Sequence, residues 1–143
     1  MFSLLIGKKT KDISKYEVEC AISQFLQQNN KVSYRVLIND DYTINYQLLR
    51  PFLKCVPNNS FLMTKQTFEI LEDTLENKEL VQLLDDVQLA VDKYILEKEK
   101  FPVIDSDEEY RVCTMKLYPY LGKHIQQDLY ISSKRYLVSS IPE

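Results

Sequence analysis

Two stretches of the chain share one apolar spacing, SKYEVECAISQFLQQ at residues 14–28 and LLDDVQLAVDKYILE at residues 83–97. In each, apolar side chains recur every three or four positions, a spacing that places them on one face of a helix. When Ser14 is aligned with Leu83, an alignment that we call the helix register, Val18 pairs with Val87, Ala21 with Ala90, Ile22 with Val91, Phe25 with Tyr94 and Leu26 with Ile95. The two stretches therefore predict two amphipathic helices with the same pattern of buried residues.

The similarity continues beyond the helices when one residue is dropped from the following loop. In this second alignment, which we call the strand register, Pro51-Phe52-Leu53 coincides with Pro119-Tyr120-Leu121. The strand register also pairs Asp41-Tyr42 with Glu109-Tyr110, Ile44 with Val112, Leu49 with Leu117, Phe61 with Leu129, Met63 with Ile131, Thr64 with Ser132, Phe68 with Tyr136 and Ile70 with Val138. The two registers favour an internal duplication, and the alternative is a coincidental order of a helix and strands in two unrelated segments.

The expected fold class is α+β, an antiparallel sheet with three or four helices, built from two similar helix–strand–strand–strand units. We place the copies at about 14–70 and 83–138, joined by a helical segment at about 65–82, within a single domain at 1–143. A unit of about 55–60 residues buries only about 60% of the surface that its unfolded chain exposes. We therefore expect the copies to pack on each other as a pseudo-two-fold, with the cleft between them as the default place for a ligand.

Local patterns predict the elements of each copy. Ser14 and Glu17 have the spacing of a capping box before a first helix at about 15–28. Strands are predicted at 32–38, 42–44, 61–63, 101–104, 110–115 and 129–131. The helical predictions are a turn closed by Pro51, a helix capped by Thr64 that holds Phe68, Leu71 and Leu75, and a long helix from about Asn77 that stops at Phe101-Pro102. Residues 134–138 fit either a strand or a short helix.

The composition describes a globular protein. Of 143 residues, 45% are hydrophobic and 27% are charged, which argues against a disordered chain. The net charge is −3, whereas nucleic-acid binders normally carry a net positive charge or a strong basic stripe. We therefore do not expect a nucleic-acid partner, although Lys8, Lys9, Lys11 and Lys15 form a basic cluster.

The cysteines and the N-terminus indicate a compartment. Cys20, Cys55 and Cys113 are an odd number at wide spacing, which fits free thiols in a reducing cytoplasm. The apolar run Met1–Gly7 precedes its lysines, the reverse of a signal peptide, and is too short to cross a bilayer. We expect this run to add a strand or a staple to the core, with weak membrane contact as the alternative. The expected location is cytoplasmic, without a transmembrane segment.

Few residues have the spacing of a catalytic or metal site. His124 is the only histidine and lies in an expected loop, so no nucleophile–histidine pair is indicated. Asp105-Ser106-Asp107-Glu108-Glu109 concentrates carboxylates, but Tyr110 and Lys116 stand where an EF-hand needs glycine and glutamate. Glycines only at positions 7 and 122 exclude the phosphate-binding glycine motifs. We assign no catalytic, metal-binding or cofactor-binding residue, expect no cofactor, and favour a protein that is not an enzyme.

Tyrosines and an uneven charge carry the functional expectation. Residues 1–70 hold nine basic and six acidic side chains, and residues 71–143 hold nine basic and fifteen acidic. Tyrosine is enriched at protein interfaces because it combines a large apolar ring with a polar tip. The candidate partner-binding residues are Tyr110, Tyr118, Tyr120, Tyr130, Asp105, Asp107, Glu108 and Glu109.

These features favour a non-enzymatic protein-binding module of unknown partner, of the adaptor or inhibitor/immunity type. One alternative is a small-molecule sensor or an enzyme that uses a cleft between the two halves. Another is self-association into a homodimer.

Several segments resemble small, uncharacterised cytosolic proteins of Gram-positive bacteria. The resemblance is carried by Ala90-Val91-Asp92-Lys93-Tyr94, Phe101-Pro102, Tyr120-Leu121, Tyr130-Ile131 and Asp41-Tyr42-Thr43-Ile44. It implies a bacterial cytosolic origin and no particular chemistry.

Overall fold

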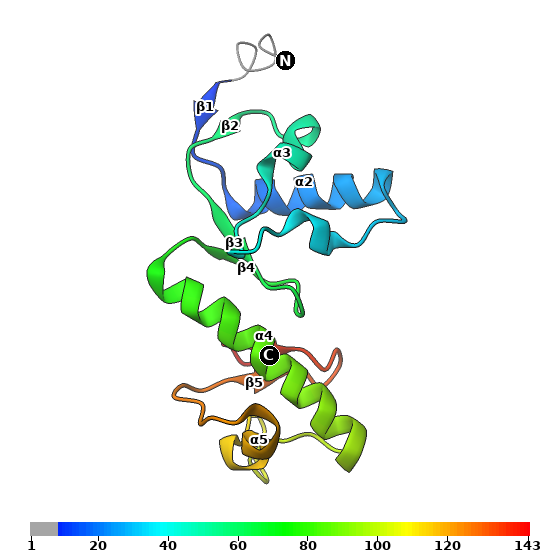
Figure 1. Ribbon diagram of the computed structural model, residues 1–143, viewed down its shortest axis with the longest axis vertical. Coiled ribbons are helices and arrows are strands. Elements are labelled where there is room, and N and C mark those ends of the chain that lie inside the picture. The colour runs from blue at the N-terminus through cyan, green and yellow to red at the C-terminus, as the bar shows by residue number, and fades with distance from the viewer. Residues whose placement is uncertain (1–8) are drawn as a thin grey trace. The chain divides into compact units, whose positions relative to one another are not determined.

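The computed structural model describes residues 9–143 (Figure 1). The strand or staple predicted for Met1–Gly7, and Lys8 of the basic cluster, lie outside these residues. The chain divides into two compact units, of which the first ends at Val81 and the second is Gln82–Glu143. The boundary falls inside the long helix α4 (Leu75–Lys98).

The first unit begins with the predicted helix. Helix α2 (Lys15–Gln28) starts after Ser14, whose hydroxyl accepts a hydrogen bond from the N–H of Glu17. Its buried residues Val18, Ala21, Ile22 and Phe25 form the face that the apolar spacing predicts. The remaining elements are β1 (Thr10–Lys11), η1 (Tyr34–Leu37), α3 (Tyr46–Leu49), η2 (Arg50–Phe52), β2 (Val56–Pro57), β3 (Phe61–Met63) and β4 (Ile70–Glu72).

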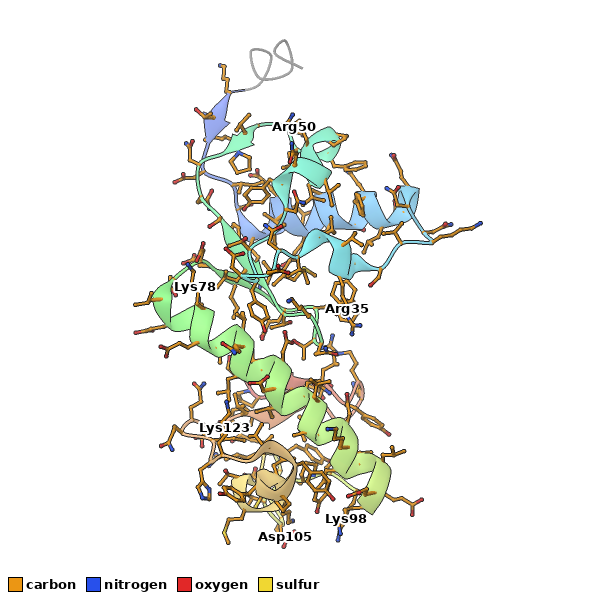
Figure 2. All side chains as sticks on the ribbon, in the orientation of Figure 1. Arg35, Arg50, Lys78, Lys98, Asp105 and Lys123 are labelled. Carbon is orange, nitrogen blue, oxygen red and sulfur yellow. The ribbon has the colours of Figure 1, made fainter. Side chains whose placement is uncertain are left out.

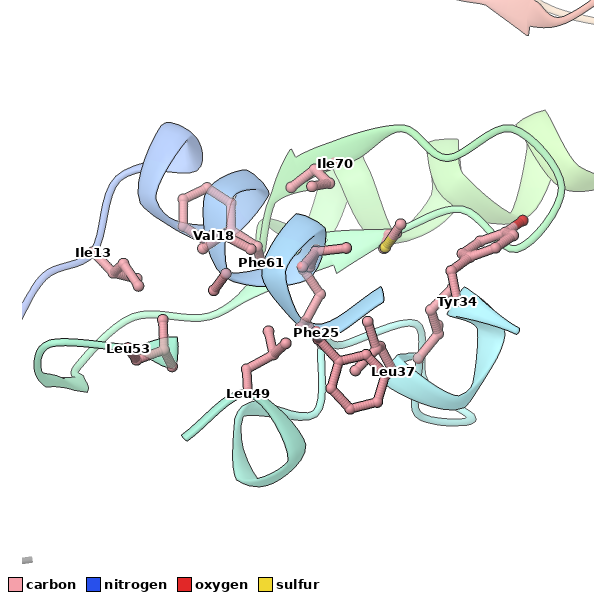
Figure 3. Close-up of a cluster of buried hydrophobic side chains, with 14 residues drawn as sticks. Ile13, Val18, Phe25, Tyr34, Leu37, Leu49, Leu53, Phe61 and Ile70 are labelled. Carbon is pink, nitrogen blue, oxygen red and sulfur yellow. The ribbon is translucent and has the colours of Figure 1, made fainter. Parts of the chain in front are cut away.

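A buried cluster of apolar side chains lies within the first unit (Figure 3). Strands β1 and β2 pair in parallel, and β3 and β4 form an antiparallel hairpin with Leu62 opposite Leu71. Residues of α2, η1, α3 and β3 contribute to one buried cluster: Ile13, Val18, Ala21, Ile22, Phe25, Tyr34, Leu37, Ile38, Ile44, Leu49, Leu53, Phe61, Met63 and Ile70.

The strand predicted at 32–38 is wrong. The side chain of Ser33 accepts a hydrogen bond from the N–H of Arg35 and caps the 3-10 helix η1. Tyr34 and Leu37 are buried, whereas Val36 is 47% exposed. Residues three apart share a face in a 3-10 helix, and this spacing prevails over the alternation that favours a strand.

The helix predicted after Thr64 is also wrong. The Thr64 hydroxyl accepts a hydrogen bond from the N–H of Glu69 and closes a hairpin loop, so the chain returns as β4. Threonine side chains bond to nearby backbone groups in loops as readily as at helix starts. The expected helical segment at 65–82 is therefore helical only from Leu75 onward.

The second unit contains most of the longest helix, α4. Within α4, Leu84, Val87, Ala90, Val91 and Tyr94 are buried, as the apolar stripe predicts. The other elements are α5 (Thr114–Leu121), β5 (Tyr130–Ile131) and β6 (Val138–Ser139).

In the second unit, one predicted strand is wrong, and the segment left open between a strand and a short helix ends in a strand. The strand predicted at 110–115 is reduced to isolated bridges at Arg111 and Val112, because α5 begins at Thr114 and removes the following residues from any ladder. The segment at 134–138 resolves into a turn followed by β6, which pairs antiparallel with β5.

The described chain is α+β, with four α-helices and small antiparallel sheets. The expected single antiparallel sheet is instead three two-stranded sheets, of which β1–β2 is parallel. The packing of the two copies as a pseudo-two-fold stays a prediction.

Several contacts of the first unit have counterparts in the second at the positions that the strand register pairs. The N–H of Ile44 donates to the carbonyl of Phe61 at 3.0 Å, and the N–H of Val112 donates to the carbonyl of Leu129 at 2.8 Å. Three further pairs of backbone hydrogen bonds follow the same register: Met63 to Tyr42 and Ile131 to Tyr110, Thr64 to Glu69 and Ser132 to Leu137, Tyr42 to Asn39 and Tyr110 to Asp107.

Ring contacts recur in a similar way. Phe25 and Phe52 meet edge to face with centroids 6.3 Å apart, and Tyr94 and Tyr120 do so at 5.6 Å. In each unit, the contact joins the amphipathic helix to the residue that follows a proline. The helix register pairs Phe25 with Tyr94, and the strand register pairs Phe52 with Tyr120.

Candidate functional site

An exposed aromatic cluster lies in the second unit. The ring of Phe101 meets Tyr110 and Tyr136 edge to face, with centroids 5.9 and 5.1 Å away. Tyr110 and Tyr136 are 39% and 52% exposed. Phe101 follows the end of α4, and Tyr136 lies in the β5–β6 hairpin. We call Phe101, Tyr110 and Tyr136 the second aromatic cluster.

Both exposed tyrosines have a left-handed backbone. Tyr110 has φ of 57° and Tyr136 has φ of 60°, a region that costs an L-residue about 1–2 kcal/mol. Hydrogen bonds hold each in place: the carbonyl of Tyr110 accepts from the N–H of Ile131, and the N–H of Tyr136 donates to the carbonyl of Ser132. A bulky side chain in this region is a genuine outlier and points to a constraint beyond local preference.

Gln88 of α4 anchors the Tyr136 backbone from outside the hairpin. Its buried side-chain amide donates to the carbonyl of Tyr136 at 3.0 Å and to the carboxylate of Asp92 at 2.9 Å. Its oxygen accepts from the N–H of Val138 at 2.7 Å. Gln88 therefore holds the backbone of the hairpin in place at Tyr136.

The first unit presents a related arrangement, which we call the first aromatic cluster (Tyr34, Tyr42 and Phe68). The ring centroids of Tyr34 and Phe68 lie 3.9 Å apart at an interplanar angle of 35°, and Phe68 is 56% exposed. Phe68 has φ of 62° and Tyr42 has φ of 70°. The ammonium group of Lys65 lies 4.7 Å from the Tyr42 ring centroid. Left-handed aromatic residues thus occur at the two positions that the strand register pairs with Tyr110 and Tyr136.

Cations accompany the hairpin in the first unit. The guanidinium of Arg35 donates to the carbonyl of Lys65 at 2.9 Å and to the side chain of Gln66 at 3.1 Å, and Figure 2 shows Arg35 beside this hairpin. The Tyr34 hydroxyl donates to the same Lys65 carbonyl. Arg35 and Lys65 are therefore held close to the first aromatic cluster.

The acidic loop is paired with cations of its own unit. Lys116 contacts Asp105 at 2.8 Å and also donates to the carbonyl of Val103. The hydrogen bond between Lys116 and Asp105 lowers the pKa of Asp105 and raises the pKa of Lys116. Arg111 lies 3.6 Å from Asp107 and 3.7 Å from Glu109. Glu108 is exposed and takes no part in these ion pairs.

Arg111 also connects the loop to a neighbouring tyrosine. Its guanidinium lies 5.8 Å from the Tyr130 ring centroid. The carboxylate of Asp128 is the main cause of a raised pKa at Arg111. Most of the loop's negative charge is thus balanced locally, so Asp105, Asp107 and Glu109 offer a weaker acidic face than the sequence suggests.

The other predicted tyrosines have separate surroundings. Tyr118 is 45% exposed and its ring centroid lies 4.7 Å from that of His124. The hydroxyl of Tyr120 donates to the carboxylate of Glu97, which raises the pKa of Tyr120. Among the four tyrosines proposed from the sequence, Tyr110 alone belongs to the second aromatic cluster.

The sequence interpretation missed Tyr34, Tyr42, Phe68, Phe101 and Tyr136 as site residues. The strand register pairs Tyr42 with Tyr110 and Phe68 with Tyr136, but those pairs served only to support a duplication. The left-handed backbone of these four paired residues has no signal in the sequence, because asparagine, aspartate and glycine are the residues expected in that conformation.

Within residues 9–143, no three histidine, cysteine, aspartate or glutamate side chains are placed to hold a metal ion. His124 is exposed, and the three cysteines are free thiols. None of the helices in residues 9–143 combines the length and the apolar character that a membrane-spanning helix needs.

A comparison with protein-family models matches residues 8–140 to DUF3939, described as a protein of unknown function. The chain belongs to the DUF3939 family. The match covers most of both units, so both aromatic clusters lie within the DUF3939 region. Searches of curated proteins and of solved structures gave no match. The expected resemblance is therefore confirmed as far as membership of an uncharacterised family.

Proposed function

We propose that this protein is a non-enzymatic protein-binding module, of the adaptor type, that contacts its partner through the two aromatic clusters. The observation that carries the proposal is the pair of exposed aromatic residues, Phe68 and Tyr136, held in left-handed conformations at equivalent hairpin positions. Folding alone favours glycine at such positions. Strained residues are concentrated at functional sites.

The aromatic chemistry supports a protein partner. Large rings held rigid by a second ring have little conformational entropy to lose on binding, and such residues dominate binding energy at protein interfaces. Phe68 lies against Tyr34, and Tyr136 against Phe101, so each exposed ring is preorganised by a neighbouring ring. The exposed part of each ring is available for a partner side chain.

We also propose that the two units arose by duplication of one helix–strand–strand–strand unit. The recurring hydrogen bonds, the two edge-to-face ring pairs and the two pairs of left-handed aromatic residues support this history. A duplicated module offers two related binding surfaces on one chain, which suits an adaptor better than an inhibitor.

A cytoplasmic location in a bacterium completes the proposal. The three free thiols Cys20, Cys55 and Cys113 support a reducing compartment. The resemblance to proteins of Gram-positive bacteria supports the origin. Fractionation of the native cell tests the location, and recovery of the protein from the membrane or the culture medium instead of the cytosol would contradict it.

Affinity purification from the native cell tests the protein-binding function. We expect one partner at stoichiometric yield with the wild type, and its loss with the double variant Phe68→Ala/Tyr136→Ala. Leu96→Ala is the matched control, because Leu96 is an exposed apolar residue of α4 outside both clusters. Reconstitution with the purified partner then shows whether the two proteins bind directly. A dimeric mass of the chain alone would show that the partner is a second copy of the chain.

Other outcomes would overturn the proposal. A partner that the double variant retains would remove the aromatic clusters from the function. A thermal-shift increase with a small metabolite, without any stoichiometric protein, would favour the alternative of a small-molecule sensor or enzyme.

A further inference from the structure

We infer, on the basis of the proposed protein-binding function, that both aromatic clusters bind an acidic peptide segment of the partner, with apolar side chains between its carboxylates. The ground for this inference is charge complementarity. In each unit, cations lie in or beside the hairpin that carries the exposed left-handed aromatic residue. An anionic group next to an apolar side chain matches that arrangement.

In the first unit, two cations are fixed beside the rings. The guanidinium of Arg35, which is hydrogen-bonded to the hairpin, lies 5.8 Å from the Tyr34 ring centroid. A guanidinium has five N–H donors, so donors beyond those two bonds can bind a carboxylate. Lys65 of the same hairpin lies over the Tyr42 ring. A carboxylate bound by Arg35 would lie close to Tyr34, whose ring packs against the exposed ring of Phe68.

In the second unit, the hairpin turn itself is basic. Lys134 and Arg135 directly precede Tyr136, and both are exposed. Neither side chain forms an ion pair with any other described residue. Two carboxylates of this unit are already bound elsewhere, Asp92 by Gln88 and Glu143 by the Ser132 hydroxyl. The turn therefore presents two cations next to an exposed ring.

A peptide fits these surfaces better than a nucleic acid. Single-stranded nucleic acids also stack on aromatic rings, but their binding grooves carry a row of positive charge that follows the phosphate backbone. Each hairpin has only two such cations, and the whole chain carries a net charge of −3. A peptide with a few spaced acidic residues brings much less negative charge to this acidic protein than a phosphate at every nucleotide would.

Selection of random dodecapeptides by phage display on the full-length protein tests the inference. We expect enriched sequences to combine aspartate or glutamate with apolar residues. The synthetic form of an enriched peptide should bind about tenfold or more weakly to Phe68→Ala/Tyr136→Ala and to Arg35→Gln/Arg135→Gln, measured by fluorescence anisotropy. Binding should also weaken at high salt, and Leu96→Ala should bind like the wild type.

The outcomes separate this inference from the proposed function. Enriched neutral or basic peptides that still depend on Phe68 and Tyr136 would overturn the acidic ligand and leave the protein-binding function in place. Peptides that bind the double aromatic variant equally well, or no enrichment, would overturn the inference together with the role of the clusters. Tighter binding of oligo-dT than of any enriched peptide would replace the peptide by a nucleic acid.

Discussion

At the scale of single residues, Tyr46 has an unusual environment. Its hydroxyl is buried and, apart from a weak contact with the backbone of Phe61, has no hydrogen-bond partner among the described residues. Burial raises the pKa of Tyr46 to about 12, Asp73 adds to the rise, and the backbone of Phe61 partly opposes it. A buried hydroxyl without a partner costs about 1–3 kcal/mol. Phenylalanine would fill the same space without that cost.

Tyr46→Phe should change how stability depends on pH. Because the folded-state pKa lies above the ordinary value of about 10, the unfolded chain loses this proton first as pH rises. Ionisation of Tyr46 therefore lowers the free energy of unfolding as the pH rises from about 10 to about 12. Urea denaturation should show a shallower alkaline fall for the variant and equal or greater stability at neutral pH. A steeper alkaline fall would contradict this prediction.

Gln88 is a second residue whose role is set by burial. Removal of its amide leaves the buried N–H of Val138 and the carbonyl of Tyr136 without their partner. We expect Gln88→Met, which keeps the volume, to lower the free energy of unfolding by about 1–3 kcal/mol. Gln82→Met, at an exposed position of α4, is the control and should change stability by less than about 0.5 kcal/mol. Equal effects in urea denaturation would refute the buried role of Gln88.

At the scale of elements, the two hairpins depend on left-handed residues. Glycine adopts a left-handed backbone without strain, whereas alanine does not. We expect Phe68→Gly to be more stable than Phe68→Ala by about 0.5–1 kcal/mol, and the same order at Tyr136. At Lys134, whose φ is not positive, alanine should be at least as stable as glycine. Thermal unfolding of the six variants measures the order, and a preference for alanine at position 68 would contradict the observed backbone.

The elements also show where local patterns suffice. The period of the apolar residues correctly predicts α2 and α4 with their buried faces, because an amphipathic helix depends on residues three and four positions apart. The strand at 61–63 is equally well predicted. The prediction fails at η1 and after Thr64, since short segments with alternating residues fit a strand, a 3-10 turn or a loop equally well.

At the scale of the whole molecule, the two units offer a matched pair of core residues. Leu49 and Leu117 are both fully buried, one in each unit, and the strand register pairs them. Alanine at either position should lower stability by about 2–5 kcal/mol. Because Leu49 shares a buried cluster with residues of α2, whereas Leu117 lies in α5, Leu49→Ala should raise hydrogen exchange in α2 more than in α5, and Leu117→Ala should do the opposite. Equal increases in both helices would mean that the units open together.

The order of the amino acids is enough to predict the two amphipathic helices, the α+β class, and the positions that the helix and strand registers pair. These properties depend on the residue types at positions a few residues apart, and that spacing can be read from the sequence. The folded chain alone shows that Phe68 and Tyr136 are exposed in left-handed conformations and that Lys116 pairs with Asp105. The fold also shows that Gln88 holds a hairpin about 50 residues further along the chain. The partners in these contacts come from distant segments, and a linear pattern carries no record of which buried polar groups will meet.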